Sequence, residues 1–218
     1  MRILVIVPTR GRPDNIVRLD KALLDTQVDV EVMYCVDDDD PALADYVRTG
    51  IPLMIGPRKR LVGTLNDVAK QFVDDYDIIG FLGDDVVPKT HRWDNVIRDN
   101  FKPNMVAYGN DGWQGEGLPT GVFLDARIVS VLGYMVVPTL IHLFADNYWK
   151  ALGEALGTLT YLPGVDMEHM HPYAGKAEHD QTYEEANAGP VWEHDEKAFH
   201  WYVEHELAFD VEILGINE

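Results

Sequence analysis

The amino-acid sequence predicts an α/β fold in which a mostly parallel central sheet is flanked by helices. Three apolar runs, at 3–7, 30–36 and 78–82, are rich in β-branched residues and show no alternation with polar side chains. Such runs are typical of parallel strands that are buried on both faces. Segments of helical periodicity separate the runs, and a shorter apolar run at 52–55 can form a further strand. Strands that alternate with helices build a sheet with helices on both faces.

The second half of the chain predicts a more varied set of elements. We expect strands around a glycine-rich turn, then two helices, an extended segment and an amphipathic helical region, at 104–124, 125–132, 146–156, 161–170 and from 181 onward. No internal repeat, low-complexity stretch or domain linker interrupts this order. We therefore expect a single domain over residues 1–218.

The composition is that of a folded, acidic protein. Of its 218 residues, 46% are hydrophobic and 25% are charged, which is enough apolar side chain to offset the entropy of ordering. The net charge of −19 disfavours duplex DNA as a partner, because DNA binding requires lysine and arginine. The single cysteine, Cys35, excludes an internal disulfide.

The hydropathy pattern predicts a cytoplasmic protein that does not bind membranes. The apolar N-terminal run is too short and too early for a signal peptide. The longest apolar stretch, at 129–145, contains Pro138 and His142 and is too short to span a bilayer.

Side chains that can carry chemistry follow three of the predicted strands. Thr9 and Arg10 follow the first strand, four aspartates at 37–40 follow the second, and Asp84 and Asp85 follow the last. In parallel α/β sheets, ligands bind beyond the carboxyl ends of the strands, so one shared site is expected. The chain has neither a GxGxxG nor a GxxxxGKS/T motif, which argues against a dinucleotide-binding site and a P-loop.

Two sets of side chains can hold a divalent cation. Asp84 and Asp85 would repel each other without a cation, and Mg²⁺ or Mn²⁺ binds carboxylates while keeping positions for substrate phosphates. His169 and His171 project to the same side of an extended chain, and a mixed carboxylate–imidazole site suits Mn²⁺ better than Ca²⁺. The alternatives are an aspartate turn that caps the next helix, and histidines that bind zinc or lie on the surface.

Basic residues cluster in two strand-end loops of this acidic chain. They are Arg10, Arg12, Arg58, Lys59 and Arg60. Such a cluster predicts an anionic ligand, to which Lys176 can add a contact. The alternative is that these residues are solvated loop charges.

Three further features have both a functional and a structural interpretation. The aspartates at 37–40 can accept hydrogen bonds from a nucleobase or a ribose hydroxyl, or they can form a calcium-like acidic loop or a plain turn. The absence of the EF-hand spacing favours the nucleoside contact. Asp146 lies among aromatic residues at a predicted helix start, where it can act as a general base or as a helix cap. Trp113 can stack on a sugar ring or belong to the core.

Together these motifs resemble a glycosyltransferase of the GT-A fold, close to the family-2-like enzymes and to small phage-encoded ones. The resemblance covers nearly the whole chain. Residues 3–13 are similar to the opening strand and nucleotide-binding loop, and the aspartates at 37–40 to the motif that contacts base and ribose. His169-Met170-His171 is similar to the late histidine ligand. Gly83 departs from the DxD metal motif, because it stands where the first aspartate belongs.

The resemblance implies a role for each candidate residue. Asp85, His169 and His171 would bind the metal, with His171 slightly favoured over His169, and Asp146 would be the base of an inverting reaction. The residues implied to bind substrate are Pro8, Thr9, Arg10, Arg12, Asp37, Asp39, Arg58, Arg60, Asn66, Asp84, Trp113 and Lys176.

The implied activity is the transfer of a hexosyl group from a nucleotide sugar, first among them a UDP-sugar, to a hydroxyl acceptor. Mn²⁺ or Mg²⁺ is the implied cofactor. Residues 1–100 would form the nucleotide-binding half, 101–180 the acceptor and metal half, and 181–218 an acidic helical C-terminal segment. Two alternatives stay open: a metal-dependent nucleotidyltransferase and a non-catalytic module that binds nucleotide sugars.

Overall fold

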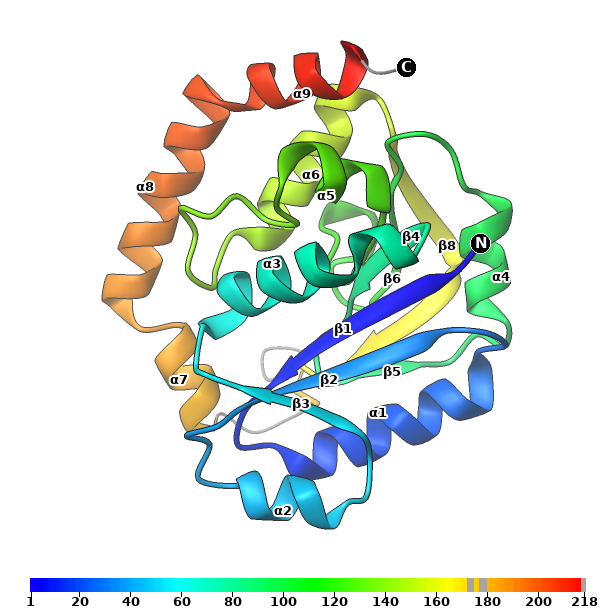
Figure 1. Cartoon of the computed structure of the whole chain (residues 1–218), viewed down its shortest axis with the longest axis vertical. Helices are drawn as coiled ribbons and strands as arrows, with labels where there is room; N and C mark the ends of the chain where they lie inside the picture. Colours follow the sequence, from blue (N-terminus) through cyan, green and yellow to red (C-terminus); the bar gives the residue numbers. More distant parts are fainter. Residues whose placement is uncertain (172–174, 177–179, 217–218) are drawn as a thin grey trace.

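A mixed eight-stranded sheet lies at the centre of the computed structural model, which describes residues 1–171, 175–176 and 180–216 (Figure 1). The strands are β1 (Ile3–Thr9), β2 (Glu31–Asp37), β3 (Leu53–Gly56), β4 (Ile78–Phe81), β5 (Val86–Pro88), β6 (Val106–Asn110), β7 (Val122–Asp125) and β8 (Leu159–His169). The helices are α1 (Pro13–Thr26), α2 (Leu43–Arg48), α3 (Arg60–Phe72), α4 (Trp93–Asp99), α5 (Ala126–Leu132), α6 (Ala145–Leu156), α7 (Gln181–Ala186), α8 (Gly189–His205) and α9 (Leu207–Ile216). Two short 3₁₀ turns, η1 (Val73–Asp75) and η2 (Gly115–Gly117), complete the described elements.

Strand pairing divides the sheet into two parts. β3, β2, β1 and β4 are neighbours in that order and run parallel. Next come β7, β6, β8 and β5, in which β7 is antiparallel to both of its neighbours and β5 is antiparallel to β8. The prediction of an α/β fold with a mostly parallel sheet is confirmed. The three-residue strand β5, which ends in Pro88, is an addition that the sequence pattern does not predict.

Two hydrophobic cores, one on each face of the sheet, explain why the apolar runs do not alternate with polar residues. In β1, Ile3, Val5 and Val7 pack with apolar residues of α1, whereas Leu4 and Ile6 pack in a second cluster with α3, α5 and α6. Successive side chains of a strand point to opposite faces, so a strand covered on both faces is apolar throughout.

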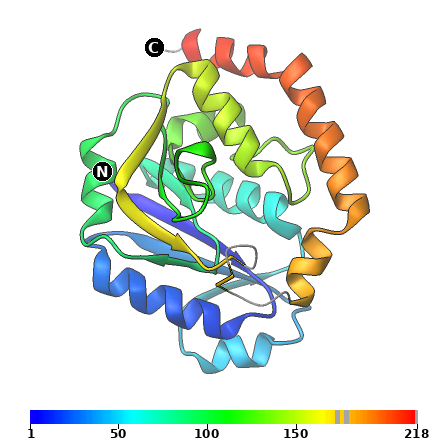
Figure 2. The ribbon, with the colours of Figure 1, turned by 180° about the vertical axis from the view of Figure 1, so that it is seen from behind.

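The last three helices, α7, α8 and α9, form what we call the C-terminal arm (residues 181–216). The arm starts beside the carboxyl ends of β1–β3, passes α3 and α6 as α8, and ends with α9 packed on α5 and α6 (Figures 1 and 2). Tyr202 and Leu214 of the arm are buried in the core. Asp210 accepts hydrogen bonds from the hydroxyls of Tyr134 and Tyr202, at 2.6 and 3.0 Å. Within the described part of the chain, no helix has the length and apolar character needed to cross a bilayer.

Asn66 on α3 holds the segment that follows α5. Its side-chain oxygen accepts hydrogen bonds from the N–H groups of Met135 and Val136, at 2.8 and 2.9 Å, and its amide donates to the Val136 carbonyl at 2.8 Å. Met135 and Val136 are buried, so water does not offer these backbone groups an easy replacement. Asn66 thus has a structural role, and its predicted role in substrate binding stays untested.

We expect Asn66→Ala to lower the free energy of unfolding by about 1–3 kcal/mol, because it leaves shielded backbone groups without partners. Denaturant unfolding would measure the change. Asn100→Ala is the control, since Asn100 is exposed and donates its amide to the Val96 carbonyl at 2.8 Å. Equal losses in the two variants would contradict the anchoring role of Asn66.

Candidate active site

A cleft of about 300 Å³ opens at the carboxyl ends of β1, β2 and β4. Most of the residues predicted to bind substrate or metal line it: Pro8, Thr9, Arg10, Arg12, Asp37, Arg58, Arg60, Asp84, Asp85, Asp146, His169 and His171. Further walls come from α7, from the residue after it and from the segment before α6. These residues are not among the predicted site residues: Thr182, Tyr183, Glu185, Ala186, Asn187, His142, Leu143 and Phe144. Asp39, Asn66, Trp113 and Lys176 lie outside the cleft lining.

Asp84 organises the floor of the cleft. It is only 4% exposed, and its carboxylate accepts hydrogen bonds from the Thr9 hydroxyl (2.6 Å), the Asn15 amide (3.2 Å) and Arg12 (3.3 Å). Burial and the neighbouring Asp85 charge raise the pKa of Asp84. Because protein groups already occupy both of its oxygens, Asp84 ties the loop after β1 and the start of α1 to the end of β4.

Asp85 faces His169, and Gly83 makes room for it. Oδ1 of Asp85 lies 3.3 Å from Nε2 of His169. A methyl group on residue 83 would lie 2.6 Å from that oxygen, so a side chain there would displace the carboxylate. Where the DxD pattern has its first aspartate, this chain has Gly83, and the Asp85 carboxylate occupies the space beside it.

His169 lies between two carboxylates. Its Nδ1 is 3.9 Å from Oδ2 of Asp111, too far for a hydrogen bond, and is a buried nitrogen without a hydrogen-bond partner in the described structure. Burial lowers the pKa of His169, but Asp111 and Asp85 outweigh it and raise the pKa to about 9. In the absence of a cation, the imidazole is therefore protonated at neutral pH.

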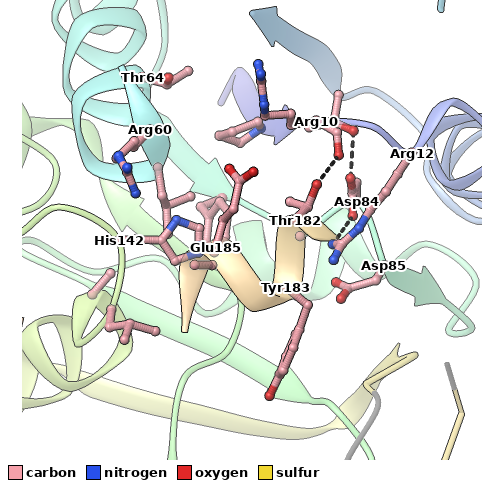
Figure 3. A pocket seen from close by; sticks show the side chains of 18 of the residues that line it. Arg10, Arg12, Arg60, Thr64, Asp84, Asp85, His142, Thr182, Tyr183 and Glu185 are labelled. Carbon is pink, nitrogen blue, oxygen red and sulfur yellow. Dashed lines mark hydrogen bonds and ion pairs between the residues drawn. The ribbon is translucent and has the colours of Figure 1, made fainter. Parts of the chain in front are cut away.

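Four arginines also line the cleft, and three of them are paired with carboxylates. Figure 3 shows Arg10, Arg12 and Arg60. Nη1 of Arg10 lies 2.9 Å from Asp37 and 2.6 Å from Asp39. Arg12 donates two hydrogen bonds to Asp180, at 2.5 and 2.7 Å. These pairs keep each guanidinium in place and neutralise much of its charge.

The pairing continues on α3 and α7. Arg58 donates to Glu185 of α7 at 2.7 Å. Arg60 begins α3 in a left-handed conformation, with φ 58°, and pairs with no carboxylate among the described residues. Arg60 is therefore the cleft arginine that is freest to meet an incoming anion.

The aspartates at 37–40 mainly hold the cationic loop after β1. Asp37 and Asp39 bind Arg10, and buried Asp40 accepts hydrogen bonds from the N–H groups of Gly11 (2.9 Å) and Ala42 (2.7 Å). Asp39 is exposed and orients Arg10 from outside the cleft. Of the two aspartates predicted to contact a nucleoside, Asp37 lines the cleft and Asp39 does not.

The segment at 141–144, which we call the wall segment, leads into α6 and Asp146. Asp146 lies in the first turn of α6 and makes no capping hydrogen bond, so the helix-cap interpretation is wrong. Burial raises the pKa of Asp146 to about 7. Burial also lowers the pKa of His142 to about 4, so this imidazole is neutral at pH 7.

Trp113 and Lys176 lie near the cleft rim. Trp113 is 43% exposed and stacks on His171, with ring centroids 4.5 Å apart. The Asp111 carboxylate fixes the loop of Trp113 by accepting hydrogen bonds from three of its backbone N–H groups, at 2.7–2.9 Å. Lys176 pairs with Glu168 at 2.9 Å and lies outside the cleft lining, so its contact with an anionic ligand stays a prediction.

Asp111, His142 and Glu185 are candidate functional residues that carry little signal in the sequence. Only Asp111 precedes a glycine, a pair typical of turns. His142 and Glu185 reach the cleft through the packing of α6 and α7, which no local pattern encodes.

The fold matches solved glycosyltransferase structures. Neither the models of known protein families nor curated protein sequences match the chain. The mannosyltransferase PcManGT from Pyrobaculum calidifontis, in complex with GDP-Man and Mn²⁺, is 12% identical, with a TM-score of 0.60 over 99% of this chain and 73% of its own. Glucosyl-3-phosphoglycerate synthase from Mycobacterium tuberculosis, in complex with Mn²⁺, UDP and phosphoglyceric acid, is 12% identical, with a TM-score of 0.56 over 88% of this chain and 76% of its own.

A third structure, S. aureus TarS 1–349 in complex with UDP, is 14% identical, with a TM-score of 0.56. The match covers 77% of this chain and 59% of the TarS fragment. At these identities the likeness concerns the path of the backbone. The chain therefore has the GT-A fold of these glycosyltransferases.

Proposed function

We propose that the chain is an inverting glycosyltransferase that moves a hexosyl group from a nucleotide sugar to a hydroxyl acceptor. The observation that carries the proposal is one cleft lined both by clustered arginines and by Asp146, whose pKa is about 7. UDP is the proposed nucleotide, as it is bound in two of the three similar structures. Residues 1–100 are proposed to bind the nucleotide, and 101–180 the acceptor and metal.

The donor's diphosphate is proposed to bind the arginines of the cleft. Guanidinium groups carry the charge opposite to that of phosphate, and their planar geometry allows two parallel hydrogen bonds to phosphate oxygens. Arg60 offers a cation without a carboxylate partner among the described side chains, and Arg12 and Arg58 lie in the same lining. Pro8, Thr9 and Asp37 line the same cleft and are proposed to contact the base and the ribose.

Asp85 and His169 fit part of a divalent cation site. One carboxylate oxygen and one imidazole nitrogen meet 3.3 Å apart, and Asp111 lies behind the imidazole, as carboxylates do behind metal-binding histidines. The His171 ring, 4.9 Å from that of His169, is the proposed third ligand. The described residues hold no ready group of three metal-binding side chains, so phosphate oxygens and water would complete the shell.

When bound, Mn²⁺ or Mg²⁺ would neutralise charge on the leaving diphosphate. Asp146 is proposed to take the proton of the acceptor hydroxyl on a carboxylate oxygen. The hydroxyl oxygen then bonds to the anomeric carbon as that carbon's bond to the diphosphate oxygen breaks. A base whose pKa is near the working pH is half-charged there and most effective.

A screen of UDP- and GDP-sugars with Mn²⁺, read as nucleoside diphosphate release, tests the proposal. Asp85→Asn and EDTA should each weaken nucleoside diphosphate binding about tenfold or more, because a charged ligand is lost. Asp38→Asn is the control, since Asp38 is exposed and outside the cleft lining. In the screen, release of pyrophosphate would instead indicate a nucleotidyltransferase. Binding of a nucleotide sugar without turnover would indicate a binding module.

Asp146→Asn should slow transfer about 10²–10⁴-fold and yet stabilise the protein at pH 8. The folded state raises the pKa of Asp146 from 3.8 to about 7, so stability falls as pH rises between these values and stays low above pH 7. Asp146→Asn removes this loss and should raise the free energy of unfolding at pH 8 by about 1–2 kcal/mol. The gain is smaller than the full pKa shift implies, because the carboxylate is only partly shielded from water. The gain in melting temperature should vanish below about pH 4. A variant that is both inactive and less stable at pH 8 would contradict the assignment.

Glu185→Gln should tighten nucleoside diphosphate binding about two- to fivefold, because Glu185 competes with phosphate for Arg58. Titration calorimetry at low salt would measure the change. Glu184→Gln removes the same charge from an exposed neighbour and should have a smaller effect. Equal tightening in both variants would point to general charge reduction.

A further inference from the structure

We infer that Asp195, on α8 of the C-terminal arm, is a positioning residue that holds the wall segment and through it Asp146. The inference rests on the proposed function, in which Asp146 is the base. The position of Asp146 would then depend on a side chain about fifty residues further along the chain.

The carboxylate of Asp195 accepts hydrogen bonds from three successive backbone N–H groups of the wall segment. The donors are Ile141 (3.0 Å), His142 (2.9 Å) and Leu143 (2.7 Å). The Asp195 side chain is 0% exposed. Consecutive N–H groups that point to one spot form an anion-binding concavity, and here the anion is the chain's own carboxylate.

The wall segment determines where α6 begins. His142, Leu143 and Phe144 line the cleft, and Asp146 follows in the first turn of the helix. The backbone of Phe144 is left-handed, with φ 62°, a conformation that a non-glycine residue keeps only where its surroundings fix it. The Phe144 carbonyl accepts the first hydrogen bond of α6, from the N–H of Tyr148 at 2.9 Å. A shift of the wall segment would therefore move Asp146.

Aromatic contacts add a second attachment between α8 and the wall segment. The Phe144 ring lies 5.3 Å from that of Trp192, in an edge-to-face arrangement, and 5.7 Å from that of Phe199. On the opposite side, the N–H of Val62 on α3 donates to the Ile141 carbonyl at 3.3 Å. The wall segment is thus held between α3 and α8.

Stability alone does not require a charge at this place. A buried carboxylate costs free energy, which its hydrogen bonds must offset. The arm has separate anchors outside the cleft lining, in Tyr202, Leu214 and Asp210. What Asp195 adds is the fixed geometry of three consecutive residues that border the proposed base.

The test compares Asp195→Asn with Asp210→Asn, a buried carboxylate of the same arm whose partners lie outside the cleft. Amide hydrogen exchange at 141–143, UDP affinity, and turnover of the UDP- or GDP-sugar that the wild type uses fastest are measured well below the melting temperature. In Asp195→Asn we expect exchange at 141–143 to rise about tenfold or more. We also expect kcat to fall about 10- to 100-fold and UDP affinity to stay within about twofold. Asp210→Asn should keep kcat and the exchange at 141–143 near the wild-type values.

A second pair of variants covers the case in which Asp195→Asn does not fold. Trp192 and Trp201 are both 48% exposed on α8, but only Trp192 contacts Phe144, whereas Trp201 stacks on His205. Trp192→Ala should lower kcat several-fold and speed exchange at 141–143, and Trp201→Ala should change neither.

Unchanged exchange at 141–143 in Asp195→Asn would overturn the inference, whatever the activity. An equal fall of kcat in Asp195→Asn and Asp210→Asn would overturn it too, because the effect would then be one of general stability. If the wild type releases no nucleoside diphosphate from any nucleotide sugar, the proposed function fails. Exchange at 141–143 would still decide whether Asp195 holds the wall segment.

Discussion

The pairing of buried Asp84 with Arg12 is the interaction on which the carboxyl edge of the sheet depends. A carboxylate that is 4% exposed is costly unless cations and hydrogen-bond donors surround it. Arg12 and Thr9 come from the loop after β1, and Asn15 comes from α1. Arg12 also binds Asp180 at the start of the C-terminal arm. Three segments far apart in the sequence therefore adopt one arrangement together.

The same principle explains how a chain of net charge −19 can hold a cluster of arginines in one cleft. Arg10, Arg12 and Arg58 each have at least one carboxylate within 2.9 Å. These acids keep the arginines in place and offset most of their charge in the cleft when no ligand is bound. Binding of a diphosphate would then be an exchange of anions around fixed guanidinium groups, with a smaller electrostatic gain than for bare cations.

Most of the fold could be predicted from the sequence, because parallel strands buried on both faces are locally visible as apolar runs. β1, β2 and β4 are of this kind, and the helices between them follow from periodicity. β5 could not be predicted, since three residues ending in proline carry no strand pattern and form a strand only by pairing with β8. Propensity is a weak guide where tertiary pairing decides.

The candidate site was predictable to the extent that residues at strand ends share one edge of a sheet. Thr9, Asp37 and Asp85 meet in the cleft for that reason. Asn66 and Asp39 resemble substrate contacts in the sequence, but their side chains bind the protein's own groups. The choice between internal and external partners depends on neighbours within a few ångströms, which the order of residues along the chain does not specify.

The proton affinity of Asp146 is likewise a property of the assembled cleft. Its place in the first turn of α6 favours the charged form, yet burial outweighs this effect and raises the pKa to about 7. The wall segment, which precedes Asp146 and borders the same cleft, depends on α8 for its backbone hydrogen bonds. The segment that leads into Asp146 is thus held by a helix that follows it by about fifty residues, so both halves of the chain build the surroundings of this carboxyl group.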